Sequence, residues 1–295
     1  MVEDLQSLNK DAITAAKRYM GGVAWFTVGF TFCVVVAYAG NLALFALGVI
    51  PVWLATTMMA VLTYMSYTPL HEAVHGNIHG NVERLQWLND LCGYAVAPLI
   101  SNPYASHRYE HFTHHRYTNI EGKDPDFVIS GLGRGIFPAF KAVFKFIWIQ
   151  SGFFALNRWG TASFREKAVY CIELLFALAW RVAFIVLVDQ PGVAVVVLLG
   201  GFLGSAFTGY WFAYRPHLPY REPLRYKNTN SLIMPGWMKP VEWFWLGQNL
   251  HSVHHLFPRV PFYKYHALHA EIEPALRAHG TPIIGVFDRQ PKAGK

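Results

Sequence analysis

Long apolar runs alternate with polar segments along the chain, and this pattern predicts membrane-spanning helices. No Asp, Glu, Lys or Arg occurs between Arg18 and Glu72. A helix of that length would reach roughly 75 Å, enough for two crossings of an apolar bilayer core about 30 Å thick. The Gly-Asn pair in AYAGNLA is typical of a tight turn and predicts two spans, near residues 22–40 and 43–66. The second span contains Pro51, which predicts a kink.

A second apolar pair follows a long polar segment. AVYCIELLFALAWRVAFIVLV predicts a span at 168–188, DQPG predicts a turn, and GVAVVVLLGGFLGSAFTGYWFA predicts a span at 192–213. LCGYAVAPLI (91–100) and GIFPAFKAVFKFIWIQ (135–150) are too short or too rich in lysine to cross, and they predict interfacial or re-entrant elements. The expected fold is an all-α integral membrane protein, one domain over residues 1–295, with two transmembrane hairpins. Its helical cytosolic cap comprises segments 1–21, 67–167 and 214–295.

Composition and charge support this plan. The chain is 53% hydrophobic and 15% charged, with a mean hydropathy of +0.23, which is too apolar for an ordinary soluble domain. Every Lys and Arg except Arg181 lies in the three polar segments, and the positive-inside rule places those segments in the cytoplasm. Arg181 would mark function, snorkel or pair inside the bundle, and we expect one of the latter two. Residues 1–21 lack the order of a signal peptide and predict an amphipathic helix.

Histidines gather at the cytoplasmic ends of the predicted spans. The chain has 14 of them, in the boxes HEAVHGNIH, HFTHH and HSVHH and as His217 after the last span. Side chains at i, i+3 and i+4 share one face of a helix, so each box can present several imidazoles together. HEAVH also matches a zinc-peptidase signature, in which Glu72 would be the general base. The candidate ligands are His71, His75, His79, His107, His111, His114, His115, His217, His251, His254 and His255.

The number of candidate ligands bears on the kind of metal site. A zinc peptidase needs three protein ligands and a water, far fewer than the chain offers. Imidazole suits zinc, copper, iron and nickel, so the ligand type does not choose among them. The ligand number favours two ions, and iron is the natural candidate because oxidation of a hydrocarbon demands redox chemistry. A metal carrier would need polar residues along its spans, where only Glu173 and Arg181 are available.

The three boxes between two helical hairpins resemble the membrane fatty-acid desaturase and hydroxylase superfamily, over nearly the whole chain to about residue 285. HHRYTNIEGKDPDF and GQNLHSVHHLFPRVPFYKY match as well. HEAVHGNIHGN, YRPHLPYREPLRYKN and VPFYKYHALHAEIEP look most like β-carotene hydroxylases of the cyanobacterial type. The resemblance implies a non-haem diiron monooxygenase that hydroxylates the ionone ring of β-carotene at C3, towards zeaxanthin, with O2 and external electrons. A fatty acyl or lipid desaturase with the same site is the alternative, and an intramembrane zinc peptidase is a remote one.

The resemblance also implies roles for particular residues. The metal ligands would be His71, His75, His111, His114, His115, His217, His251, His254 and His255. Residues beside them, orienting imidazoles or bound water, would be His79, His107, Glu72, Asp126 and Asn249. His79 and His107 could instead be further ligands, and Asp124 and Asp126 could instead cap a helix. Ala213 departs from the pattern, because some desaturases carry a polar residue four positions before the histidine that follows the last span.

The cofactor-binding motifs that the sequence lacks and its positive net charge indicate which partners to expect. Neither GxGxxG nor a CxxC cluster is present, so electrons would come from an external donor such as a ferredoxin and its reductase. The formal charge of +7 would attract an acidic donor and anionic lipid, or merely obey the positive-inside rule. We expect a lipophilic substrate from the bilayer, a multi-pass protein of the bacterial cytoplasmic membrane with its active site on the cytoplasmic side, and no nucleic-acid partner.

Overall fold

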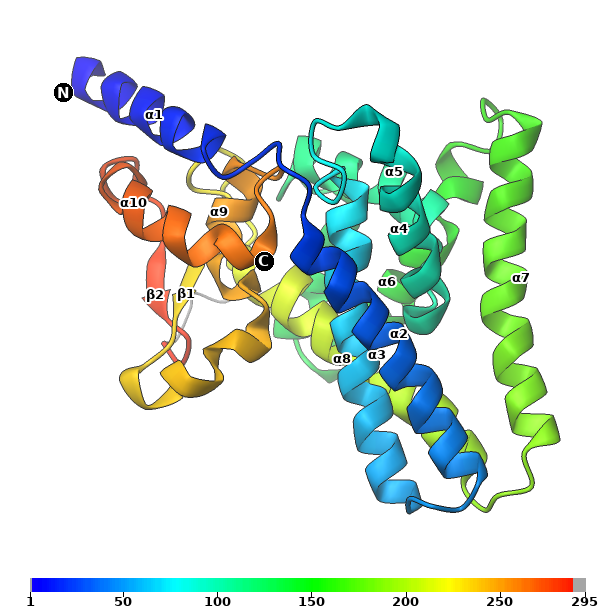
Figure 1. The fold of residues 1–295 in the computed structure, drawn as a ribbon. Helices are drawn as coiled ribbons and strands as arrows, with labels where there is room; N and C mark the ends of the chain where they lie inside the picture. The colour runs from blue at the N-terminus through cyan, green and yellow to red at the C-terminus, as the bar shows by residue number, and fades with distance from the viewer. Residues whose placement is uncertain (1, 289–295) are drawn as a thin grey trace.

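A computed structural model describes residues 2–288, and the regular secondary structure in that range is almost entirely helical (Figure 1). Two short strands, β1 (Ser231–Ile233) and β2 (Ile283–Gly285), pair in parallel. The α-helices are α1 Val2–Lys17, α2 Trp25–Ala46, α3 Val52–Val74, α4 Gln86–Ile100, α5 Tyr104–Tyr117, α6 Ile136–Asn157, α7 Phe164–Leu187, α8 Gly200–Thr208, α9 His251–Leu256 and α10 Tyr265–Ala278. Tighter 3-10 turns form η1 Glu83–Leu85, η2 Pro125–Gly133, η5 Arg215–His217, η6 Gly236–Trp245, η7 Gln248–Leu250 and η8 Phe262–Lys264. Wider π-helical turns form η3 Val195–Leu199 and η4 Gly209–Tyr214. The predicted all-helical fold is confirmed.

Four helical segments of the described chain are long and apolar enough to cross a membrane. They are α2, α6, α7 and the continuous run Val195–His217, which η3, α8, η4 and η5 form together. The last two correspond to the spans predicted at 168–188 and 192–213, and α2 includes most of the first predicted span. The prediction of an integral membrane architecture with four apolar helices is confirmed, although one of the four differs from the expected set.

The turn of the first hairpin lies later than predicted. Helix α2 continues through the Gly-Asn pair because Asn41 is buried and donates its side-chain N–H to the Ala55 carbonyl of α3, 3.0 Å away. The chain turns instead at Gly48, whose φ of +69° suits glycine. Pro51 immediately precedes α3 and is its N-cap, so it begins the helix and does not kink it.

The sequence predicted a membrane span in the segment that forms α3 and none in the segment that forms α6, but by length and apolar composition the order is reversed. Segment 135–150 was expected to be too short or too rich in lysine to cross, which is wrong, because α6 is 22 residues long and apolar enough. Helix α3 has 23 residues, but its threonines, serine and tyrosines make it less apolar, and it is not among the four. The packing of the two helices is closer to the predicted arrangement of spans. Helix α3 contacts α2 and α8, whereas α6 contacts α5 and η2 at the histidine-bearing end.

Two glycines allow α8 to lie close to α3. A Cβ atom at Gly200 would lie 2.7 Å from the Met59 Cβ atom, and one at Gly204 would lie 2.7 Å from the Thr63 Cβ atom. Small residues four apart permit this approach, as is common between helices in membranes. The contact holds the run that ends at His217 against the helix that ends at the first histidine box.

Both hairpin turns lie at one end of the bundle, at the bottom of Figure 1. The Gln190 side chain in the second turn donates a hydrogen bond of 3.2 Å to the Ala46 carbonyl at the end of α2. Helices α5 and α9 lie at the other end of the bundle, near the C-terminal end of α3 (Figure 1). The histidine-bearing segments therefore share the end opposite the turns, as the sequence predicted.

Two charged residues of α7, Glu173 and Arg181, hold the junction between α4 and α5. The Glu173 carboxylate accepts the amide N–H of Tyr104, 2.7 Å away, and that of the next residue, at the N-terminus of α5. The Arg181 guanidinium donates to the carbonyls of Pro98 and Leu99, at 2.8 and 2.9 Å, in the last turn of α4. The negative carboxylate thus binds the N-terminus of α5 and the positive guanidinium binds the C-terminus of α4, and each of these helix ends carries the opposite partial charge. The expected pairing of Arg181 inside the bundle is confirmed.

The N-terminal segment forms the predicted helix, and its apolar face packs on the C-terminal part of the chain. Ala12, Ala15 and Ala16 of α1 are buried in one cluster with Leu268 and Leu276 of α10. The Arg18 guanidinium forms an ion pair with Glu271 of the same helix. Helices α1 and α10 thus close the cap over the histidine-bearing segments.

Candidate metal centre

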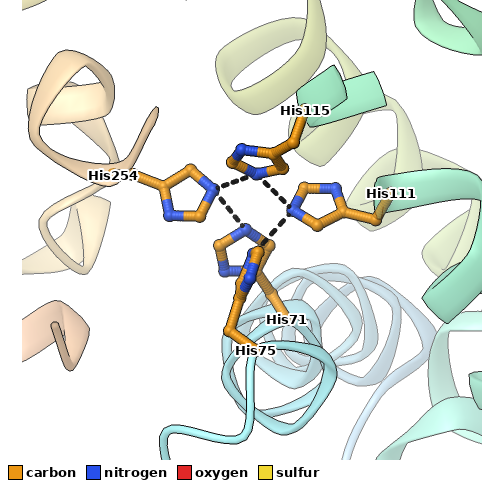
Figure 2. Close-up of side chains that lie close together, drawn as sticks. All are labelled: His71, His75, His111, His115 and His254. Carbon is orange, nitrogen blue, oxygen red and sulfur yellow. Dashed lines mark hydrogen bonds between the residues drawn. The ribbon is translucent and has the colours of Figure 1, made fainter. Parts of the chain in front are cut away.

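Five histidines from three helices converge at the end of the bundle (Figure 2). His71 lies in the last turn of α3 and His75 is its C-cap, His111 and His115 lie one turn apart on α5, and His254 lies on α9. Each offers one ring nitrogen to a group in which all five atoms lie within 4.8 Å of one another. The predicted convergence of the three boxes is therefore present in the structure.

The contacts among these five rings fit a bound cation. Nε2 of His254 lies 3.0 Å from that of His71 and 2.8 Å from that of His115. Nε2 of His111 lies 3.0 Å from that of His115 and 2.9 Å from that of His75. A neutral imidazole nitrogen carries either one proton or one lone pair in the ring plane, so it cannot serve two partners well. One cation among the five would accept all five lone pairs.

The other four predicted ligands form a second group beside the first. His114, His217 and His255 can present nitrogens within 4.8 Å of one another. The ring of His251 joins them, with its centroid 5.1 Å from that of His217 and 4.8 Å from that of His255. Within residues 2–288, neither nitrogen of the buried His217 has a hydrogen-bond partner. Such a group is costly to bury unless a metal or a hydrogen-bond partner satisfies it, so this set also fits an ion.

Two of the boxes contribute to both groups. On α5, His111 and His115 belong to the five-histidine group, while His114 belongs to the four-histidine group. On α9, His254 belongs to the first group and His255 to the second. The HxxHH spacing therefore allows one turn of helix to supply ligands to two adjacent metal positions.

Two neighbouring side chains fix the orientation of the ligands. Nδ1 of His114 lies 2.8 Å from the Asp124 carboxylate, and Nδ1 of His254 lies 3.1 Å from the Tyr265 hydroxyl. Such partners set the ring nitrogen that faces a metal. The sequence suggested Asp124 only as a helix cap, and it also N-caps η2 by accepting the Asp126 amide. Tyr265 had no signal in the sequence, because a loop separates it from the third box.

Burial keeps most of these imidazoles in the neutral form that binds metals. Desolvation lowers the pKa of His251 to about 3 and that of His107 to about 4. His114 differs, because burial lowers its pKa but the adjacent Asp124 and Asp126 carboxylates more than offset this and raise it to about 9. A cation at Nε2 of His114 would take the place of its second proton.

Three of the residues expected beside the ligands differ in where they lie. His107 and Asp126 are close to the histidine groups, and His79 is outside both groups. His107 lies beside the five-histidine group, with Nδ1 3.1 Å from a Glu110 carboxylate oxygen. Asp126 accepts a hydrogen bond from Gln150, and its other oxygen lies 3.8 Å from Nδ1 of His114. His79 is half-buried and belongs to neither histidine group.

Glu72 and Asn249 do not orient imidazoles. One Glu72 carboxylate oxygen accepts a 2.9 Å hydrogen bond from Asn77, and no hydrogen bond joins Glu72 to a histidine in the described chain. The expectation that Glu72 orients a ligand is therefore wrong, because adjacent residues on a helix do not share a face. The Asn249 amide donates to the Leu232 carbonyl of β1 and to Glu242, and it thus ties the third box to the strand.

The fold and the site define a helical membrane protein with a two-part, histidine-rich metal site. The Fatty acid desaturase family model matches residues 47–287, and the chain belongs to that family. It is similar to an sn-1 oleoyl-lipid 12-desaturase of Picosynechococcus sp. (strain ATCC 27264 / PCC 7002 / PR-6), at 28% identity over 264 residues, which cover 81% of this chain and 75% of the relative. The chain is therefore an O2-dependent oxidoreductase, integral to the membrane, with membrane lipids as its class of substrate. This result contradicts the peptidase and metal-carrier alternatives.

Proposed function

We propose that the two histidine groups bind two iron ions and that the protein is a non-haem diiron oxygenase. The observation that supports this best is the division of nine buried or half-buried histidines into two adjacent groups at one end of an apolar bundle. Imidazole suits iron, and the ligand number exceeds what tetrahedral zinc requires. When bound, the two irons would supply the activation of O2 and the oxidation of an unactivated C–H bond.

The chain's own residues would position the substrate and exclude water. Tyr67 lies one helical turn before His71, and its ring centroid is 5.6 Å from that of His71 and 5.1 Å from that of Phe212. The Tyr67 ring therefore lies beside the five-histidine group, where we place the reacting part of an apolar substrate from the bilayer. Asp124 and Tyr265 would hold their imidazoles in place while the substrate is bound.

The substrate that we propose is β-carotene, hydroxylated at C3 of its ionone ring towards zeaxanthin. The stretches HEAVHGNIHGN, YRPHLPYREPLRYKN and VPFYKYHALHAEIEP, with their similarity to carotene hydroxylases, support this choice. Desaturation of a lipid acyl chain is the second candidate, and the similarity to the Picosynechococcus lipid desaturase favours it. The same metal site could serve either reaction, because the outcome depends on the C–H bond that is presented to it.

The remaining parts of the proposal concern the setting of the enzyme. We place the histidine-bearing end on the cytoplasmic side of a bacterial cytoplasmic membrane, because the Lys and Arg residues gather in the segments at that end. Electrons would come from a ferredoxin and its reductase, and the formal charge of +7 would favour an acidic donor.

Expression in a host that makes β-carotene, followed by analysis of both pigments and fatty acids, tests the substrate. We expect hydroxylated carotenoid with the intact chain and none with His254→Ala, which removes a ligand of the five-histidine group. Unchanged β-carotene together with a new acyl double bond would instead establish the desaturase. Metal analysis of the purified protein tests the cofactor, since one zinc per chain would contradict the diiron proposal.

A further inference from the structure

Gln248 is a buried amide without a partner next to the third histidine box. Its side chain is 1% exposed, and within the described chain neither its Nε2 nor its Oε1 atom has a hydrogen-bond partner. Buried amides nearly always find partners, because an unsatisfied one loses its bonds to water without replacement. A side chain kept only for packing would be expected to be apolar. The buried, unpartnered amide of Gln248 is therefore typical of a side chain that binds a ligand.

Gln248 lies directly before the third histidine box. The turn η7 begins at Gln248 and leads through Leu250, the non-helical N-cap of α9, to His251, three residues further on. His255 is in the four-histidine group, and the ring of His251 lies beside it. The next residue, Asn249, donates its side-chain N–H to the Leu232 carbonyl of β1 and to Glu242, whereas Gln248 makes no such hydrogen bond in the described chain.

Packing and donor number support a place for Gln248 beside the four-histidine group. The turn η7 contacts η4, the segment that leads into His217. Besides the two polar atoms of Gln248, both nitrogens of His217 and Nδ1 of His251 are buried without partners in the described structure. The four-histidine group also has one donor fewer than its five-histidine neighbour.

We propose that Gln248 is a fifth donor of the four-histidine group, with its amide oxygen directed at the divalent metal ion bound there. Amide oxygens are established ligands of divalent cations. The proposal rests on the two-metal function proposed above. It goes further by assigning an oxygen donor to one of the two positions, which makes the positions chemically different from each other.

Metal titration of the purified full-length protein tests this proposal without recourse to activity. The metal-free protein is titrated anaerobically with Fe²⁺, and bound metal per chain is measured at each concentration. We expect two ions to bind to the unaltered protein. In Gln248→Leu we expect the first ion to bind normally and the second to bind about tenfold more weakly or worse. Gln248→Glu keeps an oxygen donor at the same place, and we expect it to hold both ions.

Gln190→Leu is the matched control, because it makes the same substitution in the hairpin turn at the opposite end of the bundle, and it should bind both ions normally. A Gln248→Leu protein with unchanged affinity for the second ion would overturn the proposal. If that variant does not fold, loss of the second ion from Gln248→Glu would overturn it. Fewer than two ions on the unaltered protein would contradict the diiron function itself, so the two failures are distinguishable.

Discussion

Nδ1 of His114 lies 2.8 Å from a carboxylate oxygen of Asp124, and both side chains are buried. The same carboxylate accepts the main-chain amides of Asn119 and Asp126, at 2.8 and 2.9 Å. Asp124 therefore fixes the loop after α5 and starts η2 while it orients a candidate ligand. A single carboxylate joins the local fold of GKDPDF to the four-histidine group.

This relationship predicts that Asp124→Asn weakens metal binding. Asparagine keeps an oxygen for the backbone amides but loses the charge that holds the proton on Nδ1 of His114. We expect the affinity for one of the two ions to fall by about tenfold to hundredfold. Metal content after equilibration with a weak chelator measures this. Asp126→Asn is the control, because its nearest oxygen lies 3.8 Å from the same nitrogen, and it should lose less. Equal losses in both variants would contradict the assignment to Asp124.

The histidine boxes were predictable from sequence because their spacing is local. On one helix, His111 and His115 must lie one above the other, whatever the rest of the chain does. The division of the ligands into groups of five and four was not predictable. It depends on how α3, α5 and α9, which are distant in sequence, meet at the end of the bundle.

The errors in the predicted spans have a common physical cause. Local sequence does not reveal whether a polar residue breaks a helix or finds a partner on a neighbouring one. Asn41 looked like a turn residue, but it lies inside α2 because the Ala55 carbonyl of α3 accepts its N–H. Likewise, the hydroxyl-bearing residues of α3 lower its hydropathy, yet Thr63 and Ser66 are fully buried in the bundle. By composition, α6 and not α3 therefore belongs to the four helices that are apolar enough to cross.

Substitution of Glu72 distinguishes the diiron proposal from a zinc peptidase based on the HEAVH motif. A peptidase would lose its general base in Glu72→Gln and with it all activity. In this structure Glu72 bonds to Asn77, which a glutamine at position 72 can also do through its carbonyl oxygen. We therefore expect Glu72→Gln to keep its full metal content and most of its oxidative activity. Loss of activity with metal retained would show that Glu72 takes part in the reaction.

The pH dependence of the metal-free protein should reflect its buried neutral histidines. Burial lowers the pKa of His75 and that of His251 to about 3, whereas histidine in an unfolded chain titrates near about 6.5. Between these values the unfolded chain binds protons that the folded chain does not. Stability should therefore fall with decreasing pH, by up to about 1.4 kcal/mol per pH unit for each histidine. His114 acts in the opposite sense, because its pKa is raised to about 9, so its contribution is complete below about pH 6.5 and is lost as pH rises through about 9.

Thermal unfolding of the metal-free protein across this range checks the sign. The variant His251→Asn removes one titrating group, and its stability should depend less steeply on pH between about 3 and 6.5. Glu110, whose pKa burial raises to about 7, opposes the histidines, but it is unchanged in the variant. The difference between the two proteins therefore isolates His251, and identical pH slopes would contradict its depressed pKa.

Tyr67 is expected to control the placement of the substrate without contributing to the metal site. Its ring lies between Phe212 and the rings of His71 and His107, with centroid separations of 5.1 to 5.6 Å. Tyr67→Ala removes that surface, and we expect product formation to fall by about tenfold to hundredfold, because small displacements of a reacting bond are costly. The position of oxidation should also become less specific. Tyr67→Phe keeps the ring and should behave like the unaltered protein.

Metal content and product analysis together distinguish this role from a structural one. Tyr67→Ala should bind as much metal as the unaltered protein, so a loss of metal would indicate damage to the histidine groups. Tyr94→Ala is the control, because Tyr94 on α4 is 42% exposed and belongs to neither histidine group, and its products should be unchanged. If Tyr67→Ala gives the same products at the same rate, the substrate does not approach along this side of α3, and its route to the metals must lie between other helices.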